Sequence, residues 1–125
     1  MGHRILLIDD ELDIRSYMQD HFEDRGYQVD TAGDGLEGVE KFEKNPYDLV
    51  VCDMMMPKLI GIEVLRRIKQ KKADQRVIML TGVKEESMVA RAKELGCLHY
   101  LIKPFSLRTL EEKVAECFGP ESDKG

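Results

Sequence analysis

The sequence predicts an α/β domain in which five short strands alternate with five helices. Two observations lead to this class: short apolar runs rich in branched side chains recur along the chain, and helical apolar spacing follows each of them. With 125 residues, of which 42% are hydrophobic and 34% charged, the chain can form one core and is too evenly mixed for disorder. We therefore expect a single domain over residues 1–125, whose last helix ends near residue 118 and leaves a polar tail over 119–125.

The five predicted strands are runs of four to six residues in which apolar side chains dominate. They cover residues 5–8, 27–32 (the weakest run), 49–52, 77–80 and 98–102. Strands that are apolar on both faces are typical of a parallel sheet covered by helices on both sides. A parallel sheet is also what strict strand–helix alternation predicts, because each crossover must be right-handed.

The five predicted helices each present one apolar stripe at a spacing of three or four residues. The stripes are Ile14, Met18 and Phe22; Leu36, Val39 and Phe42; Ile62, Leu65 and Ile68; Met88, Ala92 and Leu95; and Leu107, Leu110, Val114 and Phe118. Ser106 is suited to cap the last helix, and Gly119-Pro120 to end it. These elements predict a flavodoxin-like, doubly wound (βα)5 sandwich with strand order 2-1-3-4-5 and a ligand crevice at the carboxyl ends of the first and third strands.

Polar residues stand where four of these strands end. Asp9 and Asp10 follow the first strand, Asp53 the third, Thr81 the fourth and Lys103 the fifth, so we expect all five at one edge of the sheet. Three carboxylates in one pocket repel one another unless a cation is bound, and oxygen-only ligands favour Mg2+, with Mn2+ possible. A carboxylate can attack phosphorus to give an acyl phosphate if a metal ion, Lys103 and Thr81 offset the charge on the transferring oxygens.

Four motifs in order resemble those of the receiver domains of bacterial two-component response regulators, over a stretch from Arg4 to about Phe118. They are Asp9-Asp10-Glu11, Asp53-Met54-Met55-Met56-Pro57 with Gly61, Leu80-Thr81-Gly82 and Lys103-Pro104-Phe105. The resemblance implies a phosphorylation switch rather than a conventional enzyme, although such a domain assists its own phosphotransfer and autodephosphorylation. Its phosphodonor would be a sensor histidine kinase or phosphotransfer protein, and its readout a downstream protein target or an output domain outside this chain.

The resemblance also assigns roles to individual residues. Asp53 would be the phosphoacceptor, while Asp9, Asp10, Asp53 and the backbone carbonyl of Met55 would hold Mg2+. Thr81 and Lys103 would each contact a phosphoryl oxygen, and the Lys103-Pro104 peptide would be cis. Tyr100 would be a switch residue that follows Thr81, so that the signal emerges on the face of the fourth helix, fifth strand and fifth helix.

Several positions depart from the family pattern or bear on its chemistry. Ile60 stands where a polar residue is more usual and is expected to expose an apolar side chain near the site, as a partner contact would. Gly82 replaces the more usual alanine and is expected to loosen the loop after the fourth strand. Met55 and Val83, beside the path of an attacking water, are both apolar, which favours a long-lived phosphorylated form.

Three alternative functions fit the sequence less well. A phosphatase of the haloacid dehalogenase type needs an acid two residues after its nucleophile, where this chain has Met55. A flavin- or nucleotide-binding protein needs a glycine-rich first loop, and residues 9–13 are acidic without glycine. A degenerate receiver that only binds proteins would lack part of the five-residue set, which is complete here.

The composition excludes several other classes of protein. A net charge of −5 offers no basic surface for nucleic acid, and the apolar run 5–8 is too short for a signal peptide or membrane span, so a cytoplasmic location is expected. Three cysteines without metal-ligand spacing are expected to be buried apolar residues: Cys52, Cys97 and Cys117. We expect His3 to lie in a solvated terminus, and neither it nor His21 or His99 to act as a ligand or base.

Overall fold

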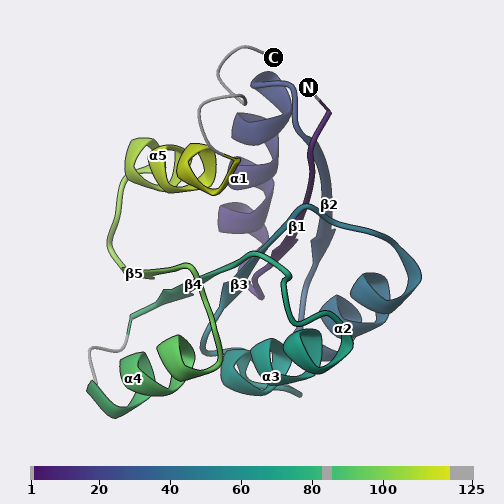
Figure 1. Ribbon diagram of the computed structural model, residues 1–125. Helices are drawn as coiled ribbons and strands as arrows, with labels where there is room; N and C mark the ends of the chain where they lie inside the picture. Colours follow the sequence, from purple (N-terminus) through teal and green to yellow (C-terminus); the bar gives the residue numbers. More distant parts are fainter. Residues whose placement is uncertain (1, 83–85, 119–125) are drawn as a thin grey trace.

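A computed structural model describes residues 2–82 and 86–118 (Figure 1). The strands are β1 (Arg4–Ile8), β2 (Gln28–Ala32), β3 (Leu49–Asp53), β4 (Val77–Thr81) and β5 (His99–Ile102). The helices are α1 (Leu12–Asp24), α2 (Gly35–Lys44), α3 (Gly61–Lys71), α4 (Glu86–Glu94) and α5 (Leu107–Phe118). All strand pairs are parallel, and the sheet order β2-β1-β3-β4-β5 confirms the predicted flavodoxin-like topology.

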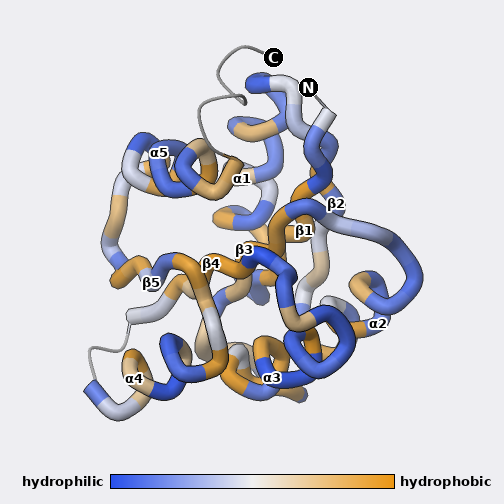
Figure 2. The backbone as a smooth tube through the Cα atoms, in the orientation of Figure 1, coloured by the Kyte–Doolittle hydropathy of each residue, from blue (hydrophilic) through white to orange (hydrophobic). Residues whose placement is uncertain are grey.

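The sheet separates two apolar cores. Alternate strand residues such as Leu6 and Val50 face the core beneath α2, α3 and α4, whereas their neighbours Ile5 and Val51 face the core beneath α1 and α5. The same division is visible in Figure 1, where α1 and α5 lie on one side of the sheet and the other three helices on the opposite side. In Figure 2 the central strands are mainly hydrophobic, while the helices alternate between hydrophobic and hydrophilic segments.

Two strands end one residue later than the apolar pattern predicts. Asp53 is the last residue of β3 and Thr81 the last residue of β4, because both still belong to the backbone ladder. Asp53 is in register with Leu80, and Thr81 with Ile102. The two polar side chains are therefore held by the sheet itself, which is a more rigid support than a loop.

The start of α3 is packed directly against the end of β3. The Gly61 amide donates to the Met54 carbonyl oxygen at 2.7 Å. A Cβ atom at position 61 would lie 2.4 Å from the Asp53 carbonyl oxygen and 2.7 Å from the Met54 Cα, both of which are backbone atoms. Only glycine allows this close approach.

The N-cap of α5 agrees with the sequence-based expectation, whereas the position of His3 does not. Ser106 caps α5 as predicted, since its Oγ accepts from the Thr109 amide at 3.1 Å, whereas Gly119-Pro120 lies outside the described residues. The expectation of a solvated His3 is wrong, because its ring stacks on Phe118 with 4.0 Å between centroids. This contact joins the start of β1 to the end of α5.

The cysteines are only partly as expected. Cys52 and Cys117 are buried, but Cys97 is half-exposed, because it lies in the turn between α4 and β5 rather than in a strand.

In the described part of the chain, no helix has the length and apolar character needed to cross a membrane.

Candidate acidic phosphoacceptor site

The carboxyl ends of β1 and β3 bring three carboxylates together. Asp9, Asp10 and Asp53 each offer an oxygen atom, and these three atoms lie within 4.8 Å of one another. Asp9 and Asp53 are buried at 0% and 4% exposure, while Asp10 is exposed and leaves the cluster open to solvent on one side. Charges this close and this poorly hydrated repel one another strongly.

Asp9 is held at nearly every polar atom. Its amide donates to the Ala32 carbonyl at 3.1 Å, its carbonyl accepts from Arg15 at 2.7 Å, and its Oδ1 accepts from the Glu11 amide at 2.9 Å. Its Oδ2 is buried without a hydrogen-bond partner among the described residues. A buried carboxylate oxygen in this state is costly, so it is a natural ligand for a cation.

Lys103 reaches the cluster from the end of β5. Its Nζ lies 3.4 Å from Asp53 Oδ2, 3.7 Å from Asp9 Oδ2 and 3.8 Å from Glu11 Oε1. Burial acts to lower the pKa of Lys103, but the charges of Asp53 and Asp9 outweigh it and raise the pKa above its ordinary value. The lysine is therefore a firmly protonated cation. The predicted cis peptide between Lys103 and Pro104 is present.

The pKa values of the two buried acids are both raised. For Asp9 and for Asp53 the main cause is desolvation, which Lys103 offsets only in part. Repulsion from Asp9 raises the pKa of Asp53 further, while its hydrogen bond from the Met55 amide, at 3.3 Å, acts in the opposite direction. One lysine does not compensate this cluster, which calls for additional positive charge.

Thr81 and Tyr100 lie on the side of the site that faces β5. Thr81 is fully buried, and the amide of Lys103 donates to its carbonyl at 2.6 Å. Burial is the main cause that raises the pKa of Tyr100, and a side-chain hydrogen bond with Thr81 acts against it. The hydrogen bond places the two expected switch residues, Thr81 and Tyr100, in contact. Tyr100 also packs against the core on the α2–α4 side.

A family model for the response regulator receiver domain matches residues 5–115. The chain belongs to this family. It is 42% identical to the alkaline phosphatase synthesis regulatory protein PhoP of Bacillus subtilis over 114 residues, which are 91% of this chain and 48% of PhoP. It is 37% identical to sporulation initiation phosphotransferase F of the same organism over 91% of this chain and 92% of that protein. The chain thus spans about half of one relative and nearly all of the other.

Solved structures agree with this assignment. A CheY-like receiver domain protein from Methanospirillum hungatei superposes with a TM-score of 0.93 at 28% identity, and each chain is covered completely. The response regulator TrrA of Thermotoga maritima, solved in complex with Mg2+ and beryllofluoride, superposes with a TM-score of 0.83 at 36% identity over 92% of this chain and 98% of TrrA. Receiver domains are signalling regulators rather than conventional enzymes, and the phosphatase alternative is not supported.

The residues of this receiver domain fit a hard divalent cation. Receiver domains bind Mg2+ at an acidic aspartate cluster, and here the three carboxylates offer only oxygen ligands. The Oδ2 of Asp9, which accepts no hydrogen bond among the described residues, and the incompletely compensated charge of Asp53 both gain from such an ion. Its role would be to neutralise negative charge and to fix the geometry of an incoming phosphoryl group.

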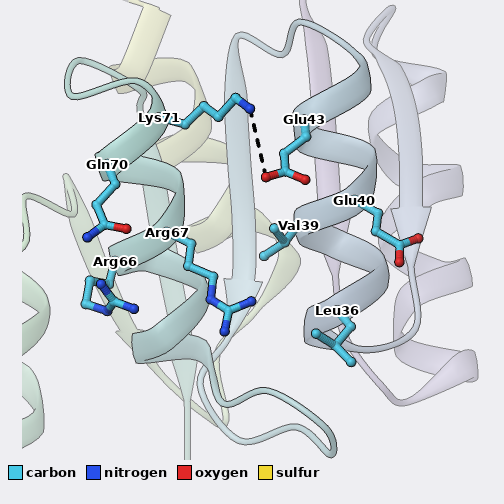
Figure 3. Close-up of a pocket in the computed structure, with 8 residues that line it drawn as sticks. All are labelled: Leu36, Val39, Glu40, Glu43, Arg66, Arg67, Gln70 and Lys71. Carbon is cyan, nitrogen blue, oxygen red and sulfur yellow. Dashed lines mark ion pairs between the residues drawn. The ribbon is translucent and has the colours of Figure 1, made fainter.

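Two hollows in the described residues are distinct from the cluster of three carboxylates. One, of about 550 Å3, lies between α2 and α3, where Lys71 and Glu43 pair at 3.9 Å across it (Figure 3). Arg67 and Glu40 also line it, so its charges are mixed, and none of the five predicted site residues borders it. The second, of about 690 Å3, is apolar and borders Lys103.

Sequence reasoning did not single out two groups near the site. Arg15 was not considered, although its position four residues after Glu11 in a predicted helix places it one turn from the acidic loop. Asp34 caps α2 through the Glu37 amide at 2.8 Å and pairs with Lys58 of the β3–α3 loop at 3.5 Å. Val83, expected beside the path of water, lies outside the described residues.

Removing one acid is expected to stabilise the metal-free protein. Asp10→Asn or Asp53→Asn relieves repulsion within the cluster, and we expect either to raise the free energy of unfolding by about 1 kcal/mol and the melting temperature by roughly 3–5 °C. Mg2+ is expected to stabilise the wild type instead, by mass action. Thermal unfolding in EDTA and in Mg2+ measures both effects, with Asp20→Asn, an exposed acid of α1, as the control.

The gain from Asp53→Asn is expected to depend on pH. The pKa of Asp53 in the folded protein is raised above its ordinary value of 3.8, so its charge destabilises the fold fully above the folded-state pKa. Below 3.8 the wild-type side chain is protonated in both states, and the variant loses its advantage. Lower apo melting temperatures for both substitutions at neutral pH would contradict the electrostatic explanation.

Proposed function

We propose that Asp53 accepts a phosphoryl group and that this receiver domain thereby acts as a phosphorylation switch. The observation that carries the proposal is the convergence of Asp53 with Asp9, Asp10 and Lys103 in one buried, solvent-connected crevice. A carboxylate oxygen of Asp53 attacks phosphorus, the phosphorus–nitrogen bond of a phosphohistidine breaks, and the histidine leaves with the bonding pair. Phosphorylation by acetyl phosphate tests the proposal directly.

The other site residues support this transfer without bonding to phosphorus. Lys103 pairs with one phosphoryl oxygen and the Thr81 hydroxyl donates to another, which offsets charge in the transition state. Mg2+, for which Mn2+ could substitute, would be held by Asp9, Asp10, Asp53 and the Met55 carbonyl. The Met55 amide already donates to Asp53 Oδ1, which orients the carboxylate for attack by the other oxygen.

The phosphodonor is proposed to be a sensor histidine kinase or a phosphotransfer protein, which docks beside the crevice. Large apolar side chains are exposed on the chain segments that follow the site residues: Leu12 is 63% exposed, Met55 52% and Ile60 47%, which bears out the expected exposure of Ile60. Next to Lys103, an apolar hollow extends to the 66% exposed Tyr17 of α1. Such an apolar surface excludes water and seats a protein whose histidine must approach Asp53.

This docking surface is expected to affect the rate of phosphotransfer from a protein donor but not from a small phosphodonor. Tyr17→Ala removes exposed apolar contact area and is expected to slow transfer from a phosphorylated partner kinase about tenfold, or about 1.4 kcal/mol. Phosphorylation by acetyl phosphate, which needs no docking, is expected to remain at the wild-type rate. Equal slowing with both donors would place Tyr17 in the site chemistry instead, and no slowing with the kinase would exclude it from the interface.

The readout is proposed to emerge on the face of α4, β5 and α5 and to act on a downstream protein target or an output domain. Thr81 and Tyr100 are hydrogen-bonded to each other, so a movement of Thr81 toward the phosphoryl group changes the packing of Tyr100 on β5. We expect beryllofluoride with Mg2+ to alter amide hydrogen exchange mainly in these elements. Changes limited to α1 and α2, or the same pattern in Tyr100→Ala, would contradict this route.

A further inference from the structure

Among the described residues, Arg15 donates the one side-chain hydrogen bond to Asp9, whereas Lys103 lies 3.7 Å from Asp9 Oδ2 as an ion pair. Arg15 Nη1 donates to the Asp9 carbonyl oxygen at 2.7 Å from the first half of α1. The remaining polar atoms of Asp9 are held by backbone groups of Ala32 and Glu11, apart from Oδ2. Arg15 is half-buried and pairs with no carboxylate among the described residues, so a surface ion pair does not account for its position.

We propose that Arg15 is a positioning residue for the Mg2+ site, and this rests on the proposed function. The guanidinium fixes the Asp9 peptide, and the Glu11 amide fixes Oδ1, so that Oδ2 keeps its direction into the acidic cluster. Without Arg15, the Asp9-Asp10 segment would be joined to α1 only through the turn in which the Glu11 amide donates to Asp9 Oδ1. Outer contacts of this kind orient metal ligands, and their loss typically weakens metal binding by about 10–100-fold.

The guanidinium of Arg15 lies beside the corner between β2 and α2. A Cβ atom at Gly33 would lie 2.9 Å from Arg15 Nη1, so glycine leaves the space that the guanidinium fills. The Gly33 amide donates to Glu37 Oε1 at 2.7 Å, which fixes the corner to the first turn of α2. Arg15 therefore lies between the loop that carries Asp9 and the β2–α2 corner at Gly33.

Two substitutions disturb this contact in different ways. Arg15→Ala removes the donor, and we expect the dissociation constant for Mg2+ to rise about tenfold. Gly33→Ala keeps Arg15 but displaces its flexible end, so a smaller loss in the same direction is expected. Arg15→Lys retains a cation with a single donor in place of the planar fork and is expected to fall between the wild type and Arg15→Ala.

The experiment is a Mg2+ titration of each variant of the 125-residue chain, followed by calorimetry and by backbone amide shifts. Arg25→Ala is the matched control, because Arg25 caps the C-terminal end of the same helix but pairs with Glu111 of α5. The Mg2+ concentration for half-maximal phosphorylation by acetyl phosphate is expected to rise in step with the dissociation constant. The rate at saturating Mg2+ is expected to stay close to that of the wild type, because Arg15 touches no reacting atom.

The outcomes separate this inference from the proposed function. Unchanged Mg2+ affinity in folded Arg15→Ala, or an equal loss in Arg25→Ala, overturns the role of Arg15 while Asp53 chemistry stands. If Arg15→Ala does not fold, wild-type affinity in Gly33→Ala overturns it. A lower rate at saturating Mg2+ with unchanged affinity also overturns it, since that result places Arg15 in the transfer step. Failure of the wild type to bind Mg2+ overturns both proposals.

Discussion

The wild-type protein is expected to gain one phosphoryl group when treated with acetyl phosphate and Mg2+, whereas Asp53→Asn gains none. Asp53 is 4% exposed, ends β3 and has one oxygen oriented by the Met55 amide, and these features support its proposed role as the nucleophile. The donor lacks the docking surface of a kinase, and the reaction therefore reports on the crevice itself. Intact-protein mass spectrometry measures the added phosphoryl group.

Two controls make this result specific. Asp20→Asn removes an exposed carboxylate from α1 and is expected to leave phosphorylation unchanged, whereas EDTA is expected to prevent it in the wild type. Modification of Asp53→Asn, or full modification in EDTA, would contradict the assignment.

The phosphorylated samples, followed after the donor is removed, measure autodephosphorylation. We expect Met55→Asn to lose the group faster, because a polar side chain at this 52% exposed position can orient the attacking water.

The convergence of the site could be predicted because strand ends are a property of the topology. Once the apolar runs establish a parallel sheet of order 2-1-3-4-5, Asp9, Asp53, Thr81 and Lys103 must come to one edge. The structure places Lys103 Nζ 3.4 Å from Asp53 and 3.7 Å from Asp9, although fifty residues separate the lysine from Asp53 in sequence. Asp10 also joins the cluster. The roles of these residues remain a proposal that the phosphorylation experiment tests.

Contacts that depend on side-chain direction could not be predicted in the same way. The hydrogen bond from Arg15 to the Asp9 carbonyl depends on the space at Gly33, which hydrophobic periodicity does not encode. The stacking of His3 on Phe118 joins residues at the two ends of the described chain, and Arg76 lies over the same ring at 5.8 Å. Such pairs follow from how the elements close on one another, not from the pattern within any one element.

Gly61→Ala is expected to damage both the fold and the site. The added Cβ would meet the Asp53 carbonyl oxygen at 2.4 Å and the Met54 Cα at 2.7 Å, and backbone atoms cannot move aside by changing rotamer. We expect the free energy of unfolding to fall by about 3 kcal/mol, which lowers the melting temperature by roughly 10 °C, although alanine is the better helix former. Because the relief must come from the peptide of Asp53, phosphorylation by acetyl phosphate is expected to slow about a hundredfold.

Gly82→Ala is the matched control for this effect, since it makes the same substitution directly after Thr81. A Cβ atom at position 82 meets nothing within 4 Å among the described residues, and the backbone there is not in the left-handed region that favours glycine. We therefore expect it to leave phosphorylation unchanged and to stabilise the protein by about 0.4–1 kcal/mol, through a less flexible unfolded chain. Thermal unfolding and the acetyl phosphate time course measure both variants side by side. Equal behaviour of the two alanines would show that the close approach of α3 to β3 does not hold Asp53 in place, whereas loss confined to Gly61→Ala ties the geometry of the phosphoacceptor to the packing of the helix that follows it.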